Sequence, residues 1–508
     1  MRVQAWLEAA SDRLSPLVVK EARQVVRSRE FVFSFLASLV AGLLIAFVGA
    51  TDALAGSSTA GQWTFNVLLG CLALLGLAVV PLAAFTTLRQ ERVEQTLELI
   101  TLTSLSSRRI IVGKLLAQSV KLLTLFAAVA PFLTMSFLLG GIDLTTIAIG
   151  LVAVYMASLW AGAFCLFLST LFRSRAASGL AFSMFGLFVL LVLFLGFNII
   201  RMVSLGFFPG IFGLGIGIGS ATGPSILKVL LVAATFWTIS LVNLVLLAEN
   251  RLSLATEDSV TPLRVGFFVQ FALMAGWSIL WWATTARIGI FDTLGTFGLV
   301  HLAAVAVFTL TEEMRVPRRV LVRQRVLYGS RLLGTLFGPG AGRAAIYLLM
   351  QMAILVIVCV LFSAAPFNWH RVLASLGYVC FFTGVPVLAF WSWAPAKVTP
   401  MRLRVAILVT VAATMVLPDV VYHLIAQPET LDLRFSTRHL INPFRTFAEW
   451  DVAEGSGWTV VPAFIGVTGL AAYIQIIVLG VVTAPKAVAL PARAESPEGA
   501  AGRGDVLD

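Results

Sequence analysis

Long apolar runs, separated by short polar or charged segments, recur along the chain between residues 31 and 484. Each run holds about 20 residues, which is the length that an α-helix needs to cross a hydrocarbon core of ~30 Å. The runs are too continuous for the alternating strands of a membrane β-barrel, whereas a helix satisfies its own backbone hydrogen bonds in lipid. The pattern therefore predicts an all-α, polytopic helical membrane protein with about twelve transmembrane helices. We expect the spans at 31–50, 64–88, 115–139, 145–171, 177–200, 227–248, 265–285, 289–310, 344–363, 371–393, 403–425 and 460–484.

The composition agrees with this class. Hydrophobic residues make up 59% of the chain and charged residues 12%, whereas soluble domains are about 45–50% apolar. The four cysteines all fall inside apolar runs and lack the spacing of metal ligands. We therefore expect inert, buried thiols, with no metal and no cofactor.

Basic residues gather at one set of span ends. If the N-terminus is cytoplasmic, the inner segments hold 28 of the 36 Lys and Arg residues, as the positive-inside rule requires. Membrane orientation thus accounts for the net charge of +11, and we expect no nucleic-acid partner. The even number of spans places both termini in the cytoplasm, in a multi-pass protein of the cell membrane.

The glycine-rich stretch 206–223 is apolar but is not counted as a span. Its seven glycines and one proline weaken a helix. Counting it as a span would also place the arginine-rich loop 315–343 outside the cell. We expect a re-entrant or interfacial excursion on the outer face.

These boundaries divide the chain into five regions. Residues 1–30 form a cytoplasmic N-terminus, 31–250 a first six-span domain, and 251–264 a polar linker. Residues 265–484 form a second six-span domain whose role is open. The tail 485–508 is rich in Ala, Pro, Gly and charge, a composition typical of disorder.

The segment 16–30 reads PLVVKEARQVVRSRE and predicts an amphipathic helix, with an apolar stripe opposite a basic face. Ser15 followed by Pro16 is a typical helix start. Such a helix lies in the headgroup plane, where anionic lipids attract it; the alternative is a simple orientation signal before the first span. The interfacial residues are Val18, Ala22, Val25 and Val26 on the stripe, with Lys20, Arg23 and Arg27 on the basic face.

An island of charge stands between the second and third spans. Residues 89–114 read RQERVEQTLELITLTSLSSRRIIVGK, in which apolar positions alternate with acidic and basic ones. The pattern predicts a short amphipathic helix over 91–100, a Thr/Ser-rich break over 101–107, and the start of the next helix. An element of this kind on the membrane surface can offer a docking face to a partner. The alternative is an ordinary charged loop.

Three runs in this part of the chain resemble the ABC-2 type permease family, the membrane half of one class of ATP-driven exporters. They are K-E-x-R-x-x-x-R-S-R at Lys20–Arg29, E-R-x-x-x-T-L-E-L at Glu91–Leu99, and L-S-x-R-x-I-x-x-G-K-L at Leu105–Leu115. The resemblance covers roughly residues 15–250. Gln95 stands where the family usually has Gly, and Ser104 where it usually has Pro.

In that family the first inner loop is a coupling helix that rests on the ATPase subunit, with the amphipathic N-terminal helix beside it. The resemblance implies that Ser106 caps the helix that leads into span three and that Gly113–Lys114 mark its entry. The ATPase-coupling residues that it implies are Glu91, Glu94, Thr96, Leu97, Glu98, Leu99, Ser106, Arg108, Arg109, Gly113 and Lys114.

The chain holds no G-x-x-x-x-G-K-[ST] loop that could cradle the phosphates of a nucleotide. ATP hydrolysis is therefore expected in a separate ABC ATPase subunit, and the chain itself is not expected to be an enzyme. The resemblance implies export of an unidentified substrate by a homodimer, or by a heterodimer with another permease. The alternatives are an ATP-independent polytopic transporter and a lipid-linked glycosyl transfer enzyme.

His301 is an isolated polar residue inside a predicted span. Polar groups in lipid face other helices or a cavity. His301 could therefore line a pathway or sense protons, or it could form a helix–helix hydrogen bond.

The topology can be tested by labelling single cysteines at Ser330 and Ser436, in a chain whose four native cysteines are replaced. We expect a membrane-impermeant maleimide to label position 436, in the outer loop 425–459, on intact cells. Position 330 should react only after the cells are permeabilised. Labelling of position 330 from outside would overturn the twelve-span topology.

Overall fold

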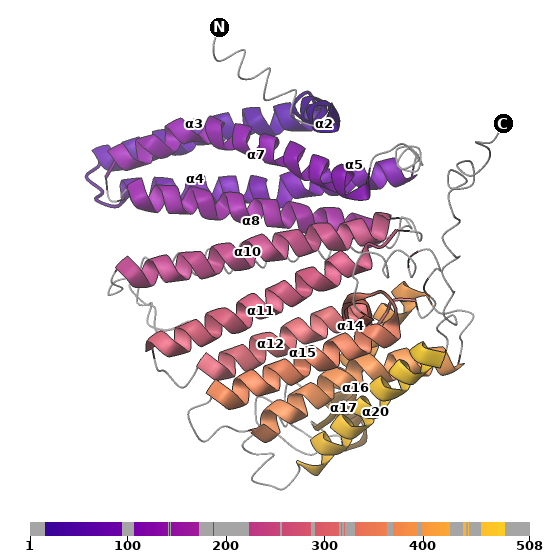
Figure 1. Cartoon of the computed structure of the whole chain (residues 1–508). Coiled ribbons are helices and arrows are strands. Elements are labelled where there is room, and N and C mark those ends of the chain that lie inside the picture. The colour runs from indigo at the N-terminus through magenta and orange to yellow at the C-terminus, as the bar shows by residue number, and fades with distance from the viewer. Residues whose placement is uncertain are drawn as a thin grey trace, which may run out of the picture. The chain divides into compact units, whose positions relative to one another are not determined.

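The computed structural model describes the chain in segments. They are 16–93, 106–140, 142, 144–171, 186, 223–253, 257–285, 290–313, 316, 320, 331–362, 369–393, 399–426, 440–442, 446 and 459–482. In these segments every regular element is a helix. The helices form two compact units, Met1–Leu254 and Ala255–Asp508, which are coloured from indigo to yellow along the chain in Figure 1. The division falls inside the predicted linker.

The first unit is built from one short helix and a set of long apolar ones. Their bounds are α2 Pro16–Val26, α3 Arg29–Leu54, α4 Ala60–Leu74, η1 Leu75–Val79, α5 Val80–Val93, α7 Ser107–Leu138, α8 Leu144–Leu171 and α10 Gly223–Leu252. Helices α4 and α5 form one continuous span, and the single π-turn η1 joins them. Helix α7 packs against α2, α3, α4 and α8, so it is the central helix of the unit (Figure 1).

The second unit has the same kind of elements. Their bounds are α11 Val260–Thr285, α12 Ile290–Thr309, α14 Arg331–Phe337, α15 Ala341–Phe362, α16 Trp369–Trp393, α17 Pro400–Ala426 and α20 Val460–Val482. Helix α20 packs most extensively on α16 and also contacts α15.

The helical class and the multi-pass character are confirmed. Within the described residues, ten helices are long and apolar enough to cross a membrane, and each coincides with a predicted span. The predicted span 289–310 is α12, whose apolar part is Phe297–Thr309. The predicted span 177–200 lies outside the described residues apart from Gly186, so the number twelve stays a prediction. The glycine-rich stretch 206–223, apart from Gly223, and the tail 485–508 lie outside them too.

One boundary differs from the prediction. The helix expected over 16–30 ends at Val26, and a new helix begins at Arg29. Ser28 has extended backbone and its Oγ accepts from the amide of Phe31 at 3.2 Å, so it is the N-cap of α3. A serine that caps a following helix ends the preceding one, which sets α2 apart from the first span.

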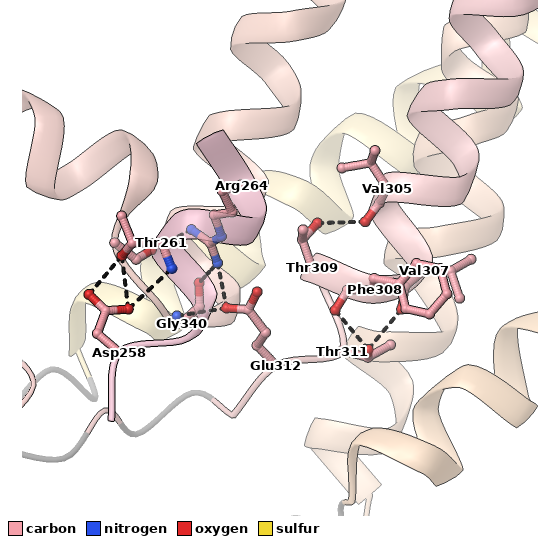
Figure 2. A network of polar contacts seen from close by, with 11 residues as sticks. Asp258, Thr261, Arg264, Val305, Val307, Phe308, Thr309, Thr311, Glu312 and Gly340 are labelled. Atoms are coloured by element: carbon pink, nitrogen blue, oxygen red, sulfur yellow. Dashed lines mark hydrogen bonds and ion pairs between the residues drawn. The ribbon is translucent and has the colours of Figure 1, made fainter. Parts of the chain in front are cut away.

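A buried cation holds the start of the second unit together, as Figure 2 shows. The fully buried Arg264 side chain on α11 contacts Glu312 Oε2 at 2.5 Å and donates to the carbonyls of Gly338 and Gly340. The Gly340 amide donates to the same Glu312 oxygen at 3.0 Å. Burial raises the pKa of the Glu312 carboxyl, while the Arg264 charge and the Gly340 amide oppose that shift. The cluster therefore joins α11, the end of α12 and the loop before α15.

Glycines let α20 approach its neighbours closely. The backbones of Gly377 on α16 and Gly466 on α20 are in contact, and a Cβ on Gly469 would overlap the backbone of Phe381. Gly342 on α15 meets Gly480 on α20 in the same way. Small residues at helix crossings are typical of membrane bundles, where close packing replaces the hydrophobic effect as the driving force.

Gly469→Ala should destabilise the second unit by about 1–3 kcal/mol, because the added methyl group forces α20 away from α16. The matched control is Gly276→Ala on α11, where a Cβ meets nothing within 4 Å and alanine favours the helix. Thermal unfolding of the two variants in detergent checks this. Equal melting temperatures would show that the α16–α20 contact does not limit stability.

Candidate functional site

The N-terminal helix α2 has the expected amphipathic character. Pro16 occupies its first turn, where the missing N–H of proline costs no hydrogen bond. The predicted basic residues are exposed: Lys20 and Arg23 lie on α2, and Arg27 follows its last residue. At the helix end, the side chain of Val26 packs against the buried cluster that includes Phe31.

Helix α2 packs against α7. The side chains of Val18, Ala22 and Val25 are outside the described residues, but Val26, from the same stripe, packs into the bundle. At its final turn the helix therefore places apolar surface against other helices of the unit.

The structure describes the two ends of the charged segment 89–114 but not residues 94–105. Helix α5 ends at Val93 and carries Glu91 in its last turn. Ser106 stands at the N-cap position of α7, and its carbonyl accepts from the Arg109 amide at 2.9 Å. Its side chain makes no capping hydrogen bond, so only the backbone part of the expected cap is present. The residues between, including Glu94, Thr96, Leu97, Glu98 and Leu99, lie outside the described residues.

Lys114 joins these two ends to α2. Its Nζ lies 2.6 Å from Glu91 Oε1 and 3.3 Å from Glu21 Oε1, and donates to both carboxylates. Glu21 comes from α2, Glu91 from α5, and Lys114 from the second turn of α7. Each of the three runs that carry the family resemblance thus contributes one member to a single ion cluster.

The Lys114 ammonium is buried, so removing its carboxylate partners would cost folding free energy. The Lys114 side chain is only 5% exposed, against 16% for Glu21 and 27% for Glu91. A buried ammonium without a carboxylate would lose its hydration, and no ion pair would compensate for that loss. Lys114 therefore fixes α2 and the end of α5 to α7, and it can do so only while both carboxylates stay in place.

A second ion pair lies nearby in the sequence of α7. Arg108 Nε contacts Glu249 Oε2 of α10 at 2.8 Å, with the arginine side chain 49% exposed. Exposed pairs of this kind contribute about 0–1 kcal/mol, so this contact adds little to stability. Arg109 is exposed and Gly113 is buried in α7.

The sequence reading missed the partners of Lys114. The resemblance implies coupling roles for Glu91 and Lys114 and none for Glu21, and in the structure all three also pair within the chain. The sequence reading also passed over Gln118 and Lys121, which are 4% and 3% exposed. Their spacing from Lys114 at i+4 and i+7 was the available signal, because such residues share one helix face.

His301 of α12 lies between two phenylalanines of α11. Its ring stacks on Phe271 at a centroid distance of 5.9 Å and meets Phe267 edge-on at 6.3 Å. Its Nε2 is buried and has no hydrogen-bond partner. The expected helix–helix hydrogen bond is therefore not made through Nε2, and aromatic packing holds the ring instead.

Lys114→Met should lower the free energy of unfolding by about 1–3 kcal/mol, because it leaves two partly buried carboxylates without their cation. The triple variant with Glu21→Gln and Glu91→Gln should recover most of this loss, since no buried charge remains. Thermal unfolding in detergent measures both, with the exposed Arg109→Met as control. A melting temperature of Lys114→Met equal to that of the control would contradict the stabilising role.

Comparison of the chain with protein-family models, with curated proteins and with solved structures finds no match in any of the three.

Proposed function

We propose that the chain is the membrane-spanning permease subunit of an ATP-driven export complex of the ABC-2 type. The observation that carries this proposal is the ion cluster of Lys114, Glu21 and Glu91. Three sequence runs that resemble the family supply its three members, although they are spread over nearly a hundred residues. A chance resemblance of three separate runs gives no reason for their residues to meet.

The cluster suggests how force would reach the membrane helices. The proposed coupling residues 94–99 follow directly from α5, and Glu91 in its last turn is bound to Lys114. A push on that segment by a partner would therefore move α5, α7 and α2 together. The buried ion pair transmits such a push, because separating it would expose an uncompensated charge.

The energy source is a separate subunit in this proposal, since the chain has no phosphate-binding loop of its own. ATP-driven closure of two ATPase subunits would act on the coupling segment of each permease in a homodimer or heterodimer. The exposed basic residues Lys20 and Arg23 of α2, and Arg27 just after it, fit the anionic headgroups of the inner leaflet.

An ATP-independent transporter is the second candidate, and one observation favours it. Lys121 is an ionisable group buried inside an apolar span, a position typical of ion-coupled carriers. Capture of an ATP-hydrolysing partner separates the two candidates, because a secondary carrier needs none.

Glu98→Arg should weaken the complex with the ATPase subunit by at least about tenfold, because like charges would face each other at the interface. The measurement is the amount of ATPase subunit that co-purifies with the tagged chain from native membranes, together with its ATP turnover. Glu495→Arg, the same charge change in the C-terminal tail, is the control. If both variants, and Leu97→Ala and Leu99→Ala as well, retain the partner fully, the segment is not the coupling element.

A further inference from the structure

A polar stripe continues along α7 beyond the ion cluster. Lys114, Gln118 and Lys121 follow one another at i, i+4 and i+7, so they share one face of the helix. All three are buried, with 6%, 4% and 3% of their surface exposed. The stripe therefore runs from the end of the span into an otherwise apolar helix.

The three members of the stripe differ in the partners of their polar atoms. Lys114 has two carboxylates. Both side-chain atoms of Gln118, Oε1 and Nε2, lack a hydrogen-bond partner. In the described part of the chain the Lys121 ammonium forms no ion pair; the charge of Glu30 acts on it, but no Glu30 oxygen lies within 4.0 Å.

Unsatisfied groups of this kind are costly and need a reason. Buried polar atoms in native proteins almost always have a partner, and an ammonium in an apolar interior is among the least favourable groups to bury. An apolar side chain of similar volume would pack at either position without this cost. The unsatisfied amide of Gln118, with the Lys121 ammonium one turn further along α7, therefore points to a ligand that accepts hydrogen bonds.

Helix α8 closes over the Gln118 amide by means of a small residue. The Gln118 amide lies against the α-carbon of Gly162 on α8, where a Cβ would overlap it. In the same way, a Cβ on Gly76 in the π-turn η1 would overlap the Ser158 hydroxyl of α8. Helices α7 and α8 are thus in close contact at Gln118, and single π-turns inside helices occur frequently at functional sites.

We propose that Gln118 and Lys121 form a binding site for an anionic group, such as a phosphate or a carboxylate, which becomes accessible when α7 and α8 separate. The Lys121 ammonium supplies the charge and up to three donors, and the Gln118 amide supplies two more. The substrate class is therefore an anion-bearing molecule. Its place in an export cycle rests on the proposed function, but the binding site itself does not.

Thermal unfolding of the detergent-purified full chain tests the site. The probes are short-chain phosphatidylglycerol, short-chain phosphatidylcholine and inorganic phosphate, each titrated separately. An anionic probe should raise the melting temperature of the wild type by a few degrees, because a ligand that binds the native state stabilises it. Phosphatidylcholine, which carries no net charge, should give no such shift.

Lys121→Met should remove the anion-dependent shift and, without probe, raise the melting temperature, because it replaces a buried unpaired charge by an apolar chain of similar length. Gln118→Leu should also reduce the rise in melting temperature that an anionic probe causes. Lys20→Met removes an exposed lysine from α2 and should leave the shift unchanged, which separates this site from surface charge. Gly162→Ala should tighten probe binding several-fold, since it wedges α7 and α8 apart.

The probes also distinguish the source of the anion. A shift with phosphatidylglycerol alone indicates a lipid headgroup or another amphiphile, and a shift with inorganic phosphate as well indicates a soluble anion. The proposal is overturned if no anionic probe shifts the wild type, or if the shift persists in both Lys121→Met and Gln118→Leu. Because the assay needs no ATPase subunit, its outcome is independent of whether an ATPase co-purifies.

Discussion

A cation buried among apolar helices is costly unless it has a partner, because an unpaired charge in a low-dielectric interior costs many kcal/mol. This constraint sets the arrangement of helix ends in each unit of the chain. In the first unit Lys114 holds carboxylates from α2 and α5. In the second, Arg264 holds Glu312 and the loop before α15 (Figure 2). Each cation joins elements whose connection runs through a charged segment of the chain.

Small residues supply the second requirement of the fold. Apolar helices gain nothing from hiding their surface from lipid, so their association depends on close contact. Gly377, Gly466 and Gly469 bring α16 and α20 into backbone contact, and Gly162 lets α8 close over Gln118. In the second unit such contacts hold helices together. In the first unit one of them, Gly162, covers a polar side chain whose buried amide atoms have no partner, so opening the α7–α8 contact would let that amide form hydrogen bonds.

The Lys114 ion cluster and the close α7–α8 contact together suggest how the proposed function would work. Lys114 couples the segment after α5 to the central helix of the first unit. The same face of α7 carries Gln118 and Lys121 one and two turns further along. A push applied at the coupling segment therefore reaches the helix that carries the proposed anion site. The coupling contact at Lys114 and the proposed anion site lie on the same helix, α7. No long chain of contacts between them is therefore required.

The sequence by itself determined the class of the protein, the position of ten spans and the existence of an exposed basic helix before the first span. Those features depend on runs of neighbouring residues and on helical periodicity, which are local. The sequence could not show that Glu21, Glu91 and Lys114 form one cluster, that Ser28 ends α2, or that Gln118 lies on Gly162. Side chains separated by tens of residues meet only through helix packing, and the free energy of a charged or polar group depends on which atoms that packing places around it.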